Sequence, residues 1–102
     1  MLVAFSVAPS GSADESGSVA KAVAAAVEVV RASGLPNRTD AMFTTIEGEW
    51  DEVMDVVRRA TEAVGAYGSR VSLVLKADIR PGFTGELDGK VERLEAHLAE
   101  RE

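Results

Sequence analysis

The sequence predicts an α+β domain in which four strands form one antiparallel sheet, two helices cover one face of the sheet, and a third helix follows at the C-terminus. Two observations indicate this fold class. Short apolar segments with the two-residue period of strands alternate with longer segments whose apolar residues recur at the spacing of helices. In addition, 46% of the 102 residues are apolar, which is enough for the core of one domain over residues 1–102.

The first predicted strand covers Leu2–Ala8 and is ended by Pro9, which has no backbone N–H to donate to a sheet. One face of this strand is bulky and consists of Val3, Phe5 and Val7. The other face has mostly small residues, namely Leu2, Ala4, Ser6 and Ala8. Because both faces are largely apolar, we expect a central strand that is covered on both sides.

Two amphipathic helices are predicted, at Val19–Ser33 and at Trp50–Gly65, and a polar loop over residues 10–18 precedes the first of them. Gly34 and Pro36 end the first helix. Its apolar face is expected to consist of Val19, Val23, Ala26, Val27 and Val30. The apolar face of the second is expected to consist of Trp50, Val53, Met54, Val57, Ala60, Thr61 and Val64, with Trp50 as a core anchor.

The remaining strands are predicted at Arg38–Ala41 and Phe43–Glu47, joined by a tight connection at Met42, and at Arg70–Asp78. A final helix is indicated by apolar residues at helical spacing, which are Leu87, Val91, Leu94 and Leu98. This βαββαβ order is the ferredoxin-like arrangement, with spatial strand order 4-1-3-2 and the first strand between the third and the fourth.

In this arrangement one face of the sheet packs on the helices and the opposite face is left open. The open face is expected to carry a polar row of Ser6, Thr45, Glu47, Ser72, Lys76 and Asp78. Leu2, Phe43 and Val74 are apolar enough to need cover there. We therefore expect a homo-oligomer in which a second copy covers this face and the last helix makes a further contact.

The composition argues against several classes of function. The formal net charge of −6 makes nucleic acid an unsuitable partner. No stretch approaches the ~18 apolar residues of a membrane span, so we expect no membrane partner and a cytoplasmic location.

Catalytic, metal and cofactor sites are not expected either. Glu47 and Glu49 are close in sequence, but the single histidine, His97, lies far away in the last helix, and there is no cysteine. No serine has a histidine partner that would activate it as a nucleophile, so we do not expect an enzyme.

The chain resembles the thiamine-binding protein family, which is related to the YkoF-like proteins. The resemblance covers nearly the whole chain, and its motifs are Phe5-Ser6-Val7-Ala8-Pro9, Thr44-Thr45-Ile46-Glu47-Gly48-Glu49-Trp50, Val71-Ser72, Lys76-Ala77-Asp78-Ile79-Arg80, Lys90-Val91 and Leu94-Glu95. It implies a ferredoxin-like fold, assembly into dimers or tetramers, and binding of thiamine or its hydroxymethylpyrimidine moiety without chemistry. This chain departs from the family pattern at Ala41-Met42-Phe43, where relatives have Pro-Met-Gly, so that Phe43 adds bulk beside the site.

The resemblance leads us to six candidate ligand-binding residues, which are Ser6, Phe43, Thr44, Thr45, Glu47 and Lys76. The Glu47 carboxylate can accept from the exocyclic amine of an aminopyrimidine, and the hydroxyls can satisfy the rest of the ring. Phe43 or Trp50 can stack on the heterocycle, and a thiazolium cation favours an aromatic face. The alternative for Glu47 is a cross-strand salt bridge with Lys76.

Two other functions remain open from the sequence. The polar row can be a hydrogen-bond network within an interface of a structural or interaction domain. It can also belong to a regulatory domain that binds another small metabolite at a subunit interface.

Overall fold

The computed structural model describes residues 1–10 and 18–101, so most of the polar loop predicted over residues 10–18 lies outside the described residues. The elements are β1 (Leu2–Ser10), α1 (Ser18–Ala32), β2 (Asn37–Thr39), β3 (Thr44–Glu47), α2 (Trp50–Val64), the 3₁₀ turn η1 (Gly65–Tyr67), β4 (Arg70–Asp78) and α3 (Glu86–Glu100). Among these residues, no helix combines the length and the apolar character needed to cross a bilayer.

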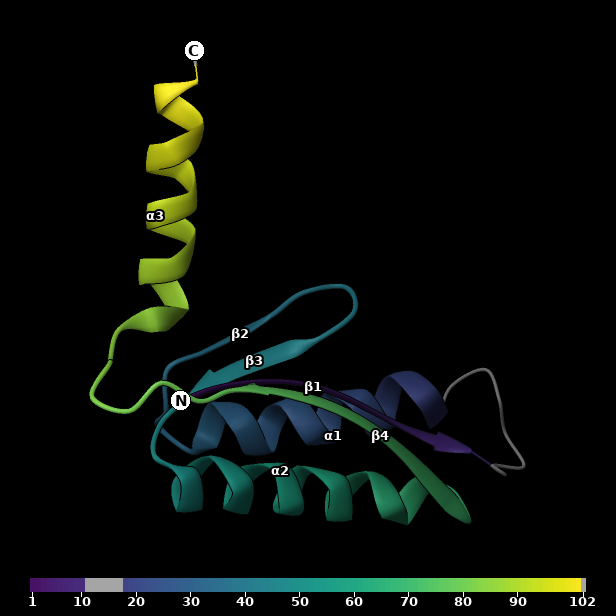
Figure 1. Ribbon diagram of the computed structural model, residues 1–102. Coiled ribbons are helices and arrows are strands. Elements are labelled where there is room, and N and C mark those ends of the chain that lie inside the picture. The colour runs from purple at the N-terminus through teal and green to yellow at the C-terminus, as the bar shows by residue number, and fades with distance from the viewer. Residues whose placement is uncertain (11–17, 102) are drawn as a thin grey trace.

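The four strands form one antiparallel sheet in the order β2-β3-β1-β4, and α1 and α2 lie side by side on one face of it (Figure 1). The predicted α+β class, the ferredoxin-like order and the position of β1 between β3 and β4 are therefore confirmed. The third helix does not join this layer: α3 leaves the sheet on the side away from α1 and α2 and projects from the body (Figure 1).

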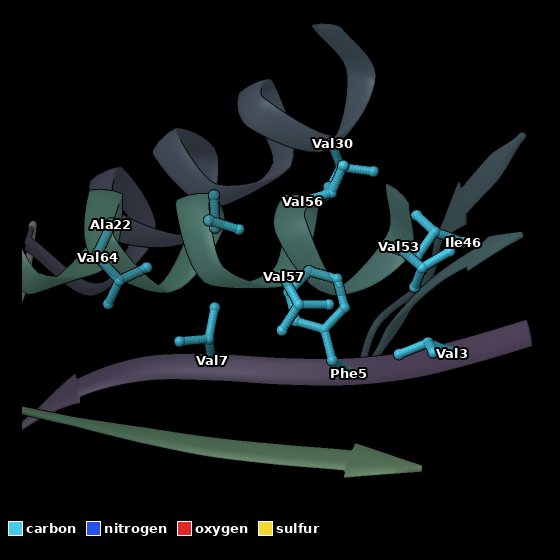
Figure 2. Packing of buried hydrophobic residues seen from close by; sticks show 12 residues of the cluster. Val3, Phe5, Val7, Ala22, Val30, Ile46, Val53, Val56, Val57 and Val64 are labelled. Atoms are coloured by element: carbon cyan, nitrogen blue, oxygen red, sulfur yellow. The ribbon is translucent and has the colours of Figure 1, made fainter. Parts of the chain in front are cut away.

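Strand register separates the two faces of the sheet. Val3 pairs with Ile46 and Ala77, and Phe5 pairs with Thr44 and Leu75, so these residues face the helices. Figure 2 shows Val3, Phe5 and Val7 pointing from β1 into the helical layer, where they meet valines of α1 and α2. The core is almost entirely aliphatic, as the composition predicts.

The opposite face, which we call the open face, is formed by the alternate positions of β1, β3 and β4. Its residues are Leu2, Ala4, Ser6, Ala8, Thr45, Glu47, Ser72, Val74, Lys76 and Asp78. The predicted polar row is thus correctly placed on one face of the sheet.

β1 extends further than predicted, to Ser10 rather than Ala8. Pro9 does not end the strand, since β1 continues through Pro9, paired with Val71, to Ser10. The reason is that β3 pairs with β1 only from Leu2 to Phe5, so that beyond Phe5 β4 is the one strand of the described residues that pairs with β1. A proline is tolerated at such an edge, where a missing N–H disrupts no ladder.

The buried face of α1 differs in part from the prediction, whereas that of α2 is largely confirmed, since Val53, Val57, Ala60 and Val64 are buried as predicted. In α1 the core face is Ala22, Ala26 and Val30, whereas Val19 and Val23 are exposed. Ala22 and Ala26 belong to the same buried cluster as the valines of α2, so small side chains make up much of the buried face of α1.

Trp50 was predicted as a core anchor, but its side chain is 54% exposed. It is the first residue of α2 and lies beyond the end of β3 at Glu47, so no strand covers it. The buried face of α2 starts one turn later, at Val53.

Candidate functional site

A groove of about 160 Å³ lies between α1, the β2–β3 hairpin and the second half of β1. It is lined by Phe5, Ser6, Val7, Ala8, Val23, Ala26, Val27, Thr39, Asp40, Ala41, Met42, Phe43 and Thr44. Three of the six predicted ligand-binding residues, Ser6, Phe43 and Thr44, are brought together in this lining. The groove is mostly apolar, with a few polar groups, which is the usual character of small-molecule sites.

The free edge of β1 forms one wall of the groove. Because β3 ends its pairing at Phe5, the backbone of Ser6–Ala8 has no strand partner among residues 1–10 and 18–101 on the side where the hairpin diverges. An unpaired strand edge presents alternating N–H donors and C=O acceptors. The groove therefore contains main-chain groups that a flat ligand with adjacent donors and acceptors can contact.

A pair of hydroxyls closes the hairpin side of the groove. Thr44 and Thr39 are cross-strand partners, and their side-chain oxygens are 3.1 Å apart in a hydrogen bond that either can donate. Thr44 is 7% exposed and faces the helical layer, on the opposite side of β3 from Thr45 and Glu47. Of the two adjacent threonines, only Thr44 belongs to the groove.

The hairpin turn holds Phe43 at the rim. One carboxylate oxygen of Asp40 accepts from the backbone N–H groups of Met42 and Phe43, each at 2.9 Å, and the Asp40 N–H donates to the Phe43 carbonyl. This turn takes up residues 40–43, so β2 is Asn37–Thr39 rather than the predicted Arg38–Ala41, and β3 begins at Thr44 rather than at Phe43. The hydrogen bonds from Phe43 and Met42 hold the pKa of Asp40 below its ordinary value, so the rim of the groove carries a negative charge at neutral pH.

The other three predicted residues, Thr45, Glu47 and Lys76, lie on the open face. Glu47 is 7% exposed, and its carboxylate accepts from the backbone N–H groups of Glu86 at 2.8 Å and Leu87 at 3.1 Å. Both of its oxygens are therefore used to cap the N-terminus of α3. In the described part of the chain no ion pair joins Glu47 to Lys76.

The capping role of Glu47 was missed by the sequence reasoning. The signal for it is at the other end of the contact: the N-cap of α3 is Gly85, which has no side chain to accept from the first amides of the helix. A helix that starts after such a glycine needs an acceptor from elsewhere, and a carboxylate also suits the positive end of the helix dipole.

Charged pairs fix the first turns of α3 to the sheet. Arg38 of β2 pairs with Asp88 at 2.5 Å, and Asp78 at the end of β4 pairs with Lys90. Within α3, Arg93 pairs with Glu86 at 2.6 Å. The hydrogen bond from Arg93 lowers the pKa of Glu86, and that from Lys90 lowers the pKa of Asp78.

These shifts predict that acid loosens α3. A carboxyl whose pKa is lower in the folded state stabilises that state above its unfolded pKa and loses this effect as the pH falls through the folded value. We expect the protection factors of α3 amides against hydrogen exchange to hold from pH 7 down to the usual carboxyl pKa near ~4 and to fall below it, so that they are lower at pH 3 than at pH 7, while those of α2 change less. In Asp78→Asn the fall should be smaller, because one titrating anchor is already absent. Equal protection of α3 at both pH values would contradict this role of the pairs.

The described residues contain no group of three or more His, Asp or Glu side chains placed to hold one metal ion. His97 lies 3.5 Å from Glu100 on the exposed part of α3. Glu49 forms a capping box with Glu52 at the start of α2.

Comparison with known proteins agrees with the family resemblance that the sequence motifs indicate. Residues 3–95 match the sequence profile of the family described as thiamine-binding protein. A UPF0045 protein of Mycobacterium bovis is 54% identical over 99 residues, which are 96% of this chain and 94% of that protein.

Two solved structures share the fold. A protein of Methanocaldococcus jannascii superposes with a TM-score of 0.80 at 30% identity, over 92% of this chain and 94% of that one. A candidate thiamine biosynthesis or salvage protein of Thermotoga maritima superposes with a TM-score of 0.72 at 27% identity, over 89% of this chain and 96% of that one.

Proposed function

We propose, from the premise that the chain belongs to the thiamine-binding protein family, that it binds thiamine or its hydroxymethylpyrimidine moiety without catalysing a reaction. The observation that carries the proposal is the groove beside the free edge of β1, where Ser6, Phe43 and Thr44 meet. The groove holds the pyrimidine ring, and no group in the lining has to act as a nucleophile or a base.

The polar groups of the groove suit an aminopyrimidine. The exocyclic amine is a donor and the neighbouring ring nitrogen is an acceptor, so one edge of the ring complements a C=O and an N–H of a strand edge. The Thr39–Thr44 hydroxyl pair can donate and accept, and therefore satisfies the ring polar atoms that the strand edge does not reach. Phe43 at the rim provides a flat apolar surface for the ring.

The size and charge of the groove support a different position for each half of thiamine. A volume of about 160 Å³ is below the ~300–1,000 Å³ of pockets for drug-sized ligands, so the groove takes one ring rather than the whole vitamin. The thiazolium then lies outside, near the Asp40 carboxylate and the ring of Phe43, both of which favour a cation.

A substitution at Thr44 tests this location. Thr44→Val keeps the shape of the side chain but removes its hydroxyl, and we expect thiamine affinity measured by isothermal titration to fall roughly two- to tenfold, since a neutral hydrogen bond contributes about 0.5–1.5 kcal/mol. The matched control is Thr45→Val, the same change one residue later on the opposite face of β3, which should bind as the unaltered protein does. Weaker binding by the control and not by Thr44→Val would move the ligand to the open face.

The roles of Thr45, Glu47 and Lys76 in ligand binding stay predictions, and they require a ligand over the open face instead of in the groove. Such a site would favour the second candidate function, a regulatory or interaction domain that binds another small metabolite at a subunit interface. A thermal-shift screen of metabolites, read together with the Thr45→Val control, separates the two. In either case we place the protein in the cytoplasm as a homo-oligomer, a dimer or a tetramer, with no nucleic-acid or membrane partner.

A further inference from the structure

The charge in the lining of the groove has one sign. Among the described residues that line it, Asp40 alone is charged at neutral pH, and the others are apolar or carry a hydroxyl. No lysine or arginine belongs to this lining. Residues 11–17 and 102, which are outside the described ranges, include no lysine or arginine either. The described part of the groove therefore offers a ligand a negative charge and no positive one.

The basic residues that are close to the groove in sequence belong to other surfaces. Arg38 directly precedes Thr39, but it pairs with Thr45 across the hairpin and forms an ion pair with Asp88 of α3, so it lies on the open face. Arg31 is exposed and lines a separate depression of about 640 Å³ along α1. A phosphate at the rim of the groove would therefore lack the cation that usually recognises it in proteins.

The Asp40 carboxylate is only half used by its own turn. One of its oxygens accepts from the backbone N–H groups of Met42 and Phe43, each at 2.9 Å. The described residues provide no ion pair to the carboxylate and no hydrogen bond to its second oxygen. The two N–H bonds fix the orientation of the carboxylate before a ligand arrives, and they leave one oxygen available to it.

We infer that Asp40 makes the groove selective for the cationic, unphosphorylated form of its ligand, so that thiamine binds in preference to its phosphate esters. The inference rests on the proposed function, because the pyrimidine ring has to occupy the groove for the rest of the ligand to reach Asp40. With the ring inside about 160 Å³, the thiazolium and its hydroxyethyl group lie at the rim. A phosphate on that hydroxyl brings roughly 1.5–2 negative charges to the same rim at pH 7.

The selectivity is the ratio of two affinities, and Asp40 acts on both of them. Its carboxylate attracts the thiazolium of either ligand but also repels the phosphate of the ester. Because Asp40 is exposed to water, the attraction is modest, and an exposed charge pair corresponds to a change in affinity of about 1.5- to 5-fold. The net charge of −6 adds a weaker repulsion of the same sign.

The test is isothermal titration at low ionic strength with thiamine, thiamine monophosphate and the neutral hydroxymethylpyrimidine. The unaltered protein should bind thiamine more tightly than the monophosphate. Asp40→Asn keeps an oxygen that can accept from the Met42 and Phe43 amides, so the turn is retained while the charge is removed. This variant should bind thiamine about 1.5- to 5-fold more weakly and hydroxymethylpyrimidine equally well, and its preference for thiamine over the monophosphate should fall by at least the same factor.

The matched control is Asp51→Asn, which changes the net charge equally at an exposed position of α2 outside the groove and should leave all three affinities unaltered. Salt provides a second measurement that needs no variant. Going from about 0.01 M to 1 M salt shortens the Debye length from roughly 30 Å to 3 Å. The preference of the unaltered protein for thiamine over the monophosphate should then decrease, while its affinity for hydroxymethylpyrimidine stays the same.

Equal affinity of the unaltered protein for thiamine and the monophosphate overturns the inference, and so does an unchanged preference in folded Asp40→Asn, with folding checked by circular dichroism. Tighter binding of the monophosphate that is lost in Arg31→Gln also overturns it and moves the phosphate to α1. If the unaltered protein binds neither thiamine nor hydroxymethylpyrimidine, the proposed function itself fails. That result differs from a failure of selectivity, in which both of these ligands still bind.

Discussion

Replacing Glu47 with alanine is expected to lower the free energy of unfolding by about 3 kcal/mol. The carboxylate is buried and accepts from the amides of Glu86 and Leu87, and a hydrogen bond to a charged group contributes roughly 1.5–3 kcal/mol. Some of the loss is recovered because water can reach the freed amide of Leu87, which is partly exposed. Urea unfolding measures the change, and hydrogen exchange at the two amides locates it.

The control for this substitution is Glu28→Ala on the exposed side of α1, where we expect a change within about 0.5 kcal/mol. Glu47→Gln should lie between the two, because the amide keeps one acceptor oxygen. If Glu47→Ala is as stable as the control and the amides of Glu86 and Leu87 do not exchange faster, Glu47 does not anchor α3.

The same variants decide where thiamine binds. Glu47 is absent from the lining of the groove, so a ligand held by Thr44 and the edge of β1 should bind Glu47→Gln with unchanged affinity. A ligand bound over the open face would contact the Glu47 carboxylate, so its affinity for Glu47→Gln should be lower than for the unaltered protein. The stability change and the affinity change are thus separate measurements with separate meanings.

Much of the fold could be predicted from the sequence because its signals are local. Alternation along Val3, Phe5 and Val7 fixes which face of β1 meets the helices, and the same period in Arg70–Asp78 fixes β4. The order of the elements then leaves few topologies, and the correct one follows.

What could not be predicted depends on where other elements end. Pro9 stays within β1 because β3 stops pairing at Phe5, and Trp50 is exposed because the sheet ends before α2 begins. The pairing that ends at Phe5 depends on β3, which is far from Pro9 in the sequence, whereas β3 ends at Glu47, only three residues before Trp50. The residue preferences of Pro9 and Trp50 alone therefore gave the wrong environment for both.

The sequence indicated only part of the proposed groove, for the same reason. A two-residue period divides the run from Phe43 to Glu47 between two faces, and of these residues only Phe43 and Thr44 line the groove. The contact of Glu47 with the α3 amides spans 39 residues and involves the backbone of its partner, so no side-chain motif announces it.

The largest effect on stability is expected at Phe5, the one aromatic residue of the buried core. Its side chain is 3% exposed, and Figure 2 shows it under Val57 in the centre of the packing between β1 and α2. Phe5→Ala leaves a cavity and should cost about 3–5 kcal/mol, a large share of the roughly 5–15 kcal/mol that stabilises a domain. Urea unfolding at pH 7 measures it.

The position of Phe5 adds a second effect, because it is also part of the lining of the groove. Phe5→Leu retains most of the apolar volume and should cost less than Phe5→Ala, yet it changes the wall against which the pyrimidine lies, so thiamine affinity should fall while the protein remains folded. The control is Leu73→Ala, on the same face of the sheet but 43% exposed and outside the groove, which should change stability by less than ~1.5 kcal/mol and leave affinity unaltered. If folded Phe5→Leu binds thiamine with unchanged affinity, the pyrimidine ring does not contact Phe5. The ligand is then held at the rim of the groove or over the open face.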